Sequence, residues 1–265
     1  MMFPDKGGPP PIEVRALRKV FRQTTSGQSV VAIEGLDLDI ASREVVAIVG
    51  QTGCGKSTFF DLMIGLEAPT AGSIVIGGKT PYGDFDHFRG QIATVFQQDR
   101  LLPWRSALDN VKLPLELIGV PEVKQRERSM AWLNRLGLGN FIGAYPHEFS
   151  GGMRQRVAIA RAFVVQPGIL LADEAFGHLD EVTAAELRET FLSLARESGS
   201  TAILITHQLE EAIGVGDRIV VFGRSAKLLA DIQVNRWQEG EYTVLREAIQ
   251  VTLQSNEQDA RLNRP

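Results

Sequence analysis

One short segment limits the possible folds of this chain more than any other. From Gly50 to Ser57 the sequence reads Gly-Gln-Thr-Gly-Cys-Gly-Lys-Ser, which fits the pattern of a glycine, four residues and then Gly-Lys-Ser/Thr. A β-branched run over 45–49 precedes it, and a segment over 56–66 that is apolar nearly all round follows it. A buried strand, a tight loop and a buried helix are therefore expected in succession, which is the context of a phosphate-binding loop.

The residues of this loop have separate expected roles. Its glycines let backbone N–H groups converge on phosphate oxygens, and the helix start adds partial positive charge. Lys56 would reach the β- and γ-phosphates of a nucleotide, and the Ser57 hydroxyl would ligate Mg²⁺. The alternative is a chance glycine-rich turn, which the flanking strand and helix disfavour. The nucleotide-binding residues expected here are Gly50, Gln51, Thr52, Gly53, Cys54, Gly55, Lys56, Ser57 and Thr58.

The rest of the chain alternates between strand-like and helix-like segments. Strands are expected over 12–21, 30–40, 45–49, 74–76, 92–96, 169–172, 202–206 and 218–222. A helix over 183–197 has an apolar stripe at Leu187, Phe191, Leu194 and Ala195. This alternation predicts an α/β fold with a mostly parallel sheet, of the P-loop (RecA-like) kind with an antiparallel β portion, and an α-helical lobe inserted over about 98–160.

The ends of the chain differ from its centre. Residues 1–11 are rich in proline and glycine and are interpreted as a loose tail. The nucleotide-binding domain is expected over 12–242. Leu245, Ile249 and Leu253 indicate a further helix over 243–253, so 243–265 is interpreted as a C-terminal helix and tail.

Composition and charge disfavour several classes of protein. The net charge of -4 over 265 residues disfavours a nucleic-acid partner. Cys54 is the single cysteine, so no internal disulfide can form and a reducing compartment is expected. No apolar run approaches the roughly 18 residues of a membrane-spanning helix, and the first residues lack the apolar core of a signal peptide. A cytoplasmic location is expected, with any membrane contact made through a partner.

A second candidate segment is the apolar strand that ends in Asp173 and Glu174. Ligands of open α/β sheets collect at the carboxyl ends of strands. Asp173 is thus expected to hold Mg²⁺, and Glu174 to orient or deprotonate an attacking water. A strand that merely ends in two solvated carboxylates is the alternative, and the phosphate loop makes it the weaker one.

The decisive segment begins at Ser150-Gly151-Gly152-Met153 and opens a helix. A serine and two glycines there present a hydroxyl, backbone amides and a helix start to an anion, although an ordinary capped helix would also look like this. The segment resembles the signature motif of ABC ATPases and lies just upstream of the acidic strand, as in that family. The resemblance covers roughly 12–237 and implies an ATP hydrolase that uses ATP and Mg²⁺.

Other family markers follow in order, and their roles are implied by the resemblance. Gln97 matches the Q-loop and would act in catalysis and at Mg²⁺, and His207 matches the switch histidine. Asp180 lies in a segment that resembles the D-loop. Phe21 occupies the place of the aromatic that stacks on adenine, and Gln155 is expected among the nucleotide-binding residues of the signature. In this family two cassettes, here expected to be identical copies, enclose each ATP between one phosphate loop and the other subunit's signature.

Four positions depart from the family pattern: Phe149, Ala175, His178 and Gln208. None removes a functional atom of the expected site. His178 raises a question about contacts across the dimer, and a surface or interface histidine without chemistry is expected. His87 and His147 have no second ligand at metal spacing, and Cys54 is expected to be a small filler residue, so a zinc site or a redox switch is disfavoured.

The stretch from Val95 to Val111 contains Arg-Leu-Leu-Pro-Trp and is similar to the nitrate/sulfonate/taurine group of bacterial importers. Leu101, Leu102 and Trp104 are expected to be exposed, although Trp104 could instead pack inside the lobe. The resemblance implies a transmembrane permease that docks near 98–116, an external solute-binding protein, and a place on the inner face of the membrane.

Other functions remain as alternatives. A soluble ABC ATPase that acts on nucleic acid would have two cassettes or a long insertion in the lobe, but 98–149 is short and there is one phosphate loop. A small-molecule kinase would have no use for the signature or His207. A degenerate cassette is disfavoured because Lys56, Asp173 and Glu174 are all present.

Overall fold

The computed structural model describes residues 8–22, 28–234, 243 and 246–254. It divides into two compact units, one formed by 1–86 with 203–265 and the other by 87–202. Among the described residues, no helix combines the length and the apolar character needed to span a membrane.

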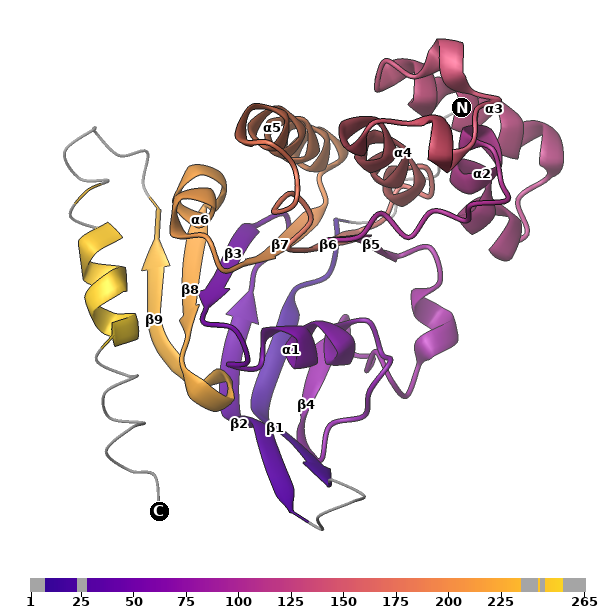
Figure 1. Ribbon diagram of the computed structural model, residues 1–265. Helices are drawn as coiled ribbons and strands as arrows, with labels where there is room; N and C mark the ends of the chain where they lie inside the picture. Colours follow the sequence, from indigo (N-terminus) through magenta and orange to yellow (C-terminus); the bar gives the residue numbers. More distant parts are fainter. Residues whose placement is uncertain (1–7, 23–27, 235–242, 244–245, 255–265) are drawn as a thin grey trace. The chain divides into compact units, whose positions relative to one another are not determined.

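The first unit contains most of the strands. Its elements are β1 (Ile12–Arg22), β2 (Ser29–Ile40), β3 (Val45–Gly50), α1 (Lys56–Met63), β4 (Ala71–Ile76), α6 (Leu209–Val215), β8 (Arg218–Phe222) and β9 (Leu228–Gln233). Strands β2, β1 and β4 form an antiparallel sheet in that order, and α1 packs against it (Figure 1). This sheet is the antiparallel portion that the sequence predicts.

The second sheet of this unit is built around β3. Strand β8 pairs with β3 in parallel and with β9 antiparallel, and β7 (Thr201–Thr206), which contains the boundary between the units, lies on the other side of β3. Every residue of β3 is buried, as expected for a β-branched strand covered on both faces. The rings of Phe59 and Phe222 pack edge to face, with their centroids 5.7 Å apart, and so connect α1 to β8.

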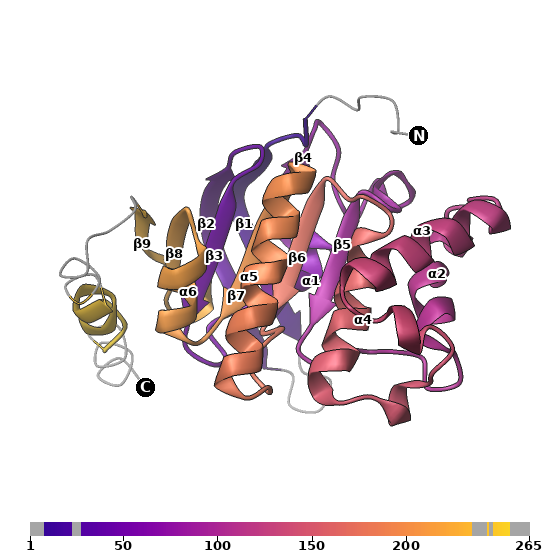
Figure 2. The same ribbon diagram turned by 90° about the horizontal axis from the view of Figure 1, so that it is seen from above.

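The second unit combines two parallel strands with four α-helices. Its elements are β5 (Ile92–Phe96), α2 (Ala107–Leu117), α3 (Glu122–Arg135), α4 (Gly151–Phe163), β6 (Ile169–Asp173) and α5 (Glu181–Ser198). Helices α2, α3 and α4 pack against one another, and α4 also packs against β5 and α5 (Figure 2). The predicted apolar stripe of α5 is confirmed, because Leu187, Phe191, Leu194 and Ala195 are all buried.

Several boundaries differ from those expected. Helix α1 ends at Met63 rather than Leu66, because Gly65 adopts a φ of 74° that stops the helix. Residues 98–106 are not helical, and α2 begins only at Ala107. Strand β9 and helix α6 were not expected. Residue 243 and residues 246–254 are helical; residues 1–7 and 255–265 of the two expected tails lie outside the described residues.

Candidate functional site

The loop between β3 and α1 has the backbone of an anion-binding site. Gly53 and Gly55 have φ values of 80° and 116°, which favour glycine. A Cβ on Gly55 would also collide with the carbonyl oxygen of Ala32. Gly55 precedes α1 and no side chain caps the first turn, so its N–H groups are not taken up by a capping residue.

Lys56 places a positive charge within this loop. Its Nζ donates to the carbonyl oxygens of Gly50 at 2.5 Å and Gln51 at 3.0 Å, and the side chain is buried. The lysine therefore curls back over the loop from the first position of α1. Ser57 follows in the same turn and is exposed. An amino group, uncapped N–H groups and an adjacent hydroxyl fit the phosphates and the metal of a magnesium nucleotide.

Cys54 lies beneath the loop. Its side chain is buried, and burial raises the pKa of the thiol, partly offset by the charge of Lys56. A Cβ on Gly50 would lie 2.7 Å from Cys54 Sγ and 2.6 Å from the carbonyl oxygen of Phe222. Cys54 is thus a packing residue that requires glycine at position 50, in agreement with the predicted filler role.

The first unit also holds Phe21 and His207. Phe21 lies near the end of β1, and 38% of it is exposed. His207 follows β7 directly and is exposed. The turn after it is fixed by Thr206, whose hydroxyl accepts from the backbone N–H of Gln208 at 3.0 Å and donates to the Glu211 carboxylate.

In the second unit, two paired strands end side by side at acidic and amide residues. Strands β5 and β6 are parallel, and Phe96 is aligned with Asp173. Gln97 therefore leaves β5 at the same edge where Asp173 and Glu174 leave β6. Glu174 has a φ of 47°, unusual for a residue with a side chain, and its carbonyl oxygen accepts from the N–H of Gly177 at 3.1 Å. The structure brings these three predicted residues together.

Gln155 differs from expectation. It is 0% exposed on α4, so its side chain has no surface to offer a nucleotide. Its Nε2 donates instead to the carbonyl oxygens of Ala175 at 2.7 Å and Phe96 at 3.3 Å. These carbonyls adjoin Glu174 and Gln97. The expected ligand contact is replaced by a structural link between the two loops, which only the tertiary packing reveals.

Ser150 caps α4, as the sequence suggests. Its Oγ accepts from the N–H of Met153 at 3.3 Å, and the residue is exposed. A Cβ on Gly152 would lie 2.8 Å from Thr183 Cγ2, so the signature glycines allow α4 to approach the start of α5. That start is capped by Asp180, which accepts from the N–H of Thr183 at 3.0 Å; this hydrogen bond lowers the pKa of Asp180.

The positions that depart from the family pattern differ in their exposure. Phe149 and Ala175 are buried, and His178 is exposed. Within the described ranges, no three His, Cys, Asp or Glu side chains are grouped so that they could hold a metal ion.

The stretch after Gln97 is only partly as expected. Trp104 is 72% exposed, but Leu101 is buried, which corrects the expectation that it is exposed. Leu102 is half-buried, and its N–H donates to Asn110 Oδ1 at 2.8 Å. Asn110 is itself fully buried and also donates to the carbonyl oxygens of Leu102, Arg105 and Ser106, so this amide holds the loop before α2.

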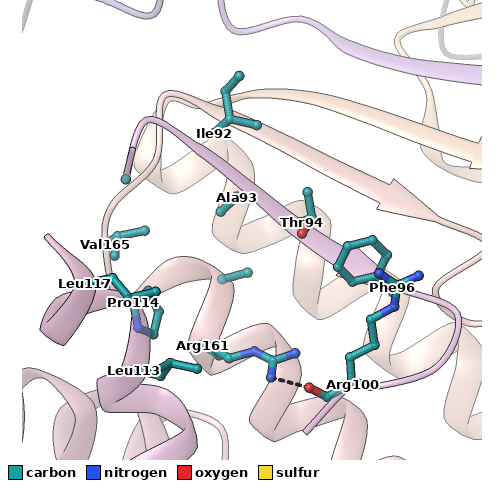
Figure 3. Close-up of a pocket in the computed structure, with 12 residues that line it drawn as sticks. Ile92, Ala93, Thr94, Phe96, Arg100, Leu113, Pro114, Leu117, Arg161 and Val165 are labelled. Carbon is teal, nitrogen blue, oxygen red and sulfur yellow. Dashed lines mark hydrogen bonds between the residues drawn. The ribbon is translucent and has the colours of Figure 1, made fainter. Parts of the chain in front are cut away.

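The second unit also contains a pocket that sequence analysis did not reveal (Figure 3). Its volume is about 320 Å³, and Leu113, Pro114 and Leu117 of α2 form an apolar wall. Arg100 lies over the ring of Phe96 at 3.7 Å, and Arg161 donates to the carbonyl oxygens of Arg100 at 2.7 Å and Asp99 at 2.6 Å. Burial lowers the pKa of Arg161, which nevertheless stays charged. The pocket therefore combines an apolar wall with two cations.

Comparison with known proteins decides which family has this arrangement. A model of the family described as ABC transporter matches residues 33–177. The chain belongs to the ABC transporter family. It is 40% identical over 219 residues to the taurine import ATP-binding protein TauB of Chromobacterium violaceum, covering 81% of this chain and 82% of that protein. It is 39% identical over 211 residues to the aliphatic sulfonates import ATP-binding protein SsuB of Pseudomonas putida, covering 80% and 72%.

Solved ABC structures agree with the fold. The dimeric structure of MJ0796, a bacterial ABC transporter cassette, matches with a TM-score of 0.74 and 29% identity, covering 85% of this chain and 100% of that one. A second dimeric structure of MJ0796, in a post-hydrolysis state bound to ADP and Pi, matches with a TM-score of 0.75 and 30% identity. The predicted α/β class with a mostly parallel sheet is confirmed for this ABC protein.

Proposed function

We propose that this chain is the ATP-binding and ATP-hydrolysing subunit of an importer for taurine, an aliphatic sulfonate, nitrate or a related small solute. The observation that carries the ATPase is the loop in which Lys56 Nζ lies over the carbonyl oxygens of Gly50 and Gln51 at the uncapped start of α1. The importer class is supported by relatives named for taurine and aliphatic sulfonate import. The solute itself is selected by the permease and the solute-binding protein.

Mg²⁺ accompanies ATP in this proposal. Ser57, Gln97 and Asp173 would provide its protein oxygens. Mg²⁺ is usually held by one or two carboxylates together with substrate phosphates and waters, so one aspartate with a hydroxyl and an amide oxygen fits this ion. The ion would neutralise charge on the phosphates as the terminal phosphate leaves.

Glu174 is the proposed catalytic base, and Gln97 and His207 are the other proposed catalytic residues. The positive φ of Glu174 turns the chain sharply where β6 ends. A strained backbone at the end of a strand is typical of residues held for chemistry rather than for stability. Glu174 orients and deprotonates the attacking water, and His207 stabilises charge on the γ-phosphate.

A second copy of the chain completes the proposed function. Ser150, Gly151 and Gly152 of one copy cradle the γ-phosphate bound by the other, with Asp180 near the shared surface. This assignment is supported by the dimeric assemblies of the similar cassettes. Phe21 stacks on adenine in the copy that holds the phosphates.

The permease is proposed to dock on the region near 98–116, at the inner face of the membrane. Trp104 is exposed there, and the pocket of Figure 3 offers an apolar wall beside Arg100 and Arg161. Exposed aromatic and arginine side chains are common at the centres of protein interfaces. A solute-binding protein would act on the far side of the permease.

ATPase assays with matched variants test this proposal. Lys56→Ala should abolish Mg²⁺-dependent turnover, and Glu174→Gln should abolish turnover but accumulate a dimer with ATP in size-exclusion chromatography. Glu127→Gln is the control, because Glu127 is an exposed carboxylate on α3 of the same unit and outside the proposed site. Near-normal hydrolysis by Glu174→Gln would refute the role of Glu174.

Coupling to import is tested separately. The chain reconstituted with its permease should hydrolyse ATP faster when the solute-binding protein carries taurine or an alkanesulfonate. ATPase activity that is stimulated by nucleic acid and unaffected by any permease would favour a soluble ABC ATPase instead.

A further inference from the structure

Lys19 is a buried lysine outside all the motifs discussed above. It lies on β1, two residues before Phe21, and is 8% exposed. Residues two apart on a strand point to the same face of the sheet. Burial of a lysine is costly unless the ammonium is paired, so its contacts require an explanation.

Three groups surround the Lys19 ammonium. Nζ donates to Glu67 Oε2 at 2.6 Å and to the carbonyl oxygen of Ala68 at 2.8 Å. It also lies 4.8 Å from the centroid of the Phe21 ring, within the range of a cation–π interaction. Two of its three N–H donors are thus used by oxygens, which fixes the ammonium against one face of the ring.

The oxygens that hold Lys19 belong to the segment that follows α1. This segment is bound to β1 at neighbouring positions as well, because the N–H of Thr70 donates to the Arg18 carbonyl oxygen at 2.8 Å and the N–H of Val20 donates to Thr70 Oγ1 at 3.0 Å. Helix α1 begins at the phosphate loop. Helix α1 therefore runs from the phosphate loop to a segment that is hydrogen-bonded to β1, the strand that contains Phe21.

We propose that Lys19 is a positioning residue for the adenine base. It covers one face of Phe21 and fixes the ring relative to the phosphate loop, so that the other face is free to stack on adenine. The inference rests on the proposed ATP-binding function. In this inference the Lys19–Glu67 pair raises the affinity for ATP only by holding the Phe21 ring in place.

A double-mutant cycle tests this coupling, because an interaction between two residues appears as non-additive effects. Lys19→Met should weaken ATP binding about three- to tenfold, because the Phe21 ring is then less firmly positioned for stacking, and should raise KM with little change in kcat. In a Phe21→Ala background the same substitution should have no further effect. Lys19→Arg should restore most of the affinity, since a guanidinium can both pair with Glu67 and stack on a ring.

Tripolyphosphate separates the contribution of the base from that of the phosphates. It has no base, so its inhibition constant, corrected for the ATP affinity of each protein, should be equal in the wild type and in Lys19→Met. Lys79→Met is the matched control, because Lys79 is also paired with a carboxylate of the same unit, at 3.8 Å from Asp84. Glu67→Gln gives a second route if Lys19→Met folds poorly, and should show a smaller loss of the same pattern.

Three results would overturn the inference. Equal losses in the wild-type and Phe21→Ala backgrounds would show that Lys19 acts elsewhere. Weaker tripolyphosphate binding would assign it to the phosphates or to the fold. Tighter ATP binding by Lys19→Met would mean that the ammonium occupies the adenine face. A wild-type chain that binds no ATP would instead refute the proposed function, and this inference with it.

Discussion

Replacing the buried Gln155 by glutamate should destabilise the fold by an amount that depends on pH. The Gln155 Nε2 must face the Phe96 and Ala175 carbonyl oxygens, because a reversed amide would direct its oxygen at both of them. Its Oε1 is buried without a hydrogen-bond partner in the described structure. Gln155→Glu replaces the donating nitrogen by an oxygen and changes almost no volume, so it tests the hydrogen bonds alone.

The expected loss in the free energy of unfolding has two parts. The neutral carboxyl that Gln155→Glu introduces can donate one proton, so one buried carbonyl loses its partner at about 1–3 kcal/mol. Ionisation adds the desolvation of a carboxylate, which raises the pKa of buried carboxyls by about 3 units or more. At about 1.36 kcal/mol per unit this adds about 4 kcal/mol. The variant should therefore be about 2 kcal/mol less stable than the wild type in acid and about 6 kcal/mol less stable at about pH 8.

The sign of this pH dependence follows from the protons that the folded and unfolded states bind. The folded-state pKa of the new carboxyl is raised above its unfolded value of about 4.3, so the folded state binds more protons. The stability of the variant relative to wild type is therefore highest below about pH 4.3. It decreases as pH rises toward the folded-state pKa and is constant above it.

Urea unfolding of both proteins between about pH 4.5 and 8, followed by circular dichroism, measures this difference. Gln155→Leu is the control, because it also removes the donor but adds no titrating group, so its penalty should not vary with pH. A Gln155→Glu penalty that is equally flat across this range would refute the burial and donor role assigned to Gln155.

Three further predictions concern the loops. Gly50→Ala should cost about 1–3 kcal/mol in urea unfolding, because the new Cβ would lie 2.6 Å from the Phe222 carbonyl oxygen; wild-type stability would contradict the packing. Cys54 should react with iodoacetamide much more slowly in the folded chain than in urea at about pH 8, because burial raises the pKa of its thiol, and equal rates would contradict this. Asp180 has a lowered pKa, so its contribution is present above the unfolded value of about 3.9 and is lost as pH falls through the folded value. Asp180→Asn keeps the acceptor for Thr183 and should lose less stability than wild type between about pH 5 and 3; identical acid transitions would contradict the assignment.

The features that the sequence predicts correctly depend on residues close together in the chain. The phosphate loop is contiguous, so its strand, glycines and helix could be predicted from neighbouring residues. The cap Ser150 bonds to a residue three positions away and is equally visible in the sequence. The strands with β-branched runs were placed within a few residues for the same reason.

The features that the sequence does not predict depend on packing between residues far apart in the chain. Gln155 contacts residues 59 and 20 positions away, and a motif alone does not show that its side chain is buried. Helix α6 has seven residues, too few to show a helical period, and β9 lies beside β8 with a mixed pattern of exposure. Leu101 was expected to be exposed from its neighbours, but the lobe buries it.

The order of strands around β3 has a consequence for how the chain folds as it is synthesised. The backbone N–H of Val45, at the start of β3, donates to the carboxylate of Asp217, which is 172 positions later. At about 5–20 residues per second, the ribosome needs on the order of 10–30 s to supply β8 after β3 has been made. The unit formed by 87–202 is continuous in sequence and is complete before that point. The wholly apolar β3 must therefore wait without β8 while the later residues are made, and until then one of its edges is open to pairing with another chain.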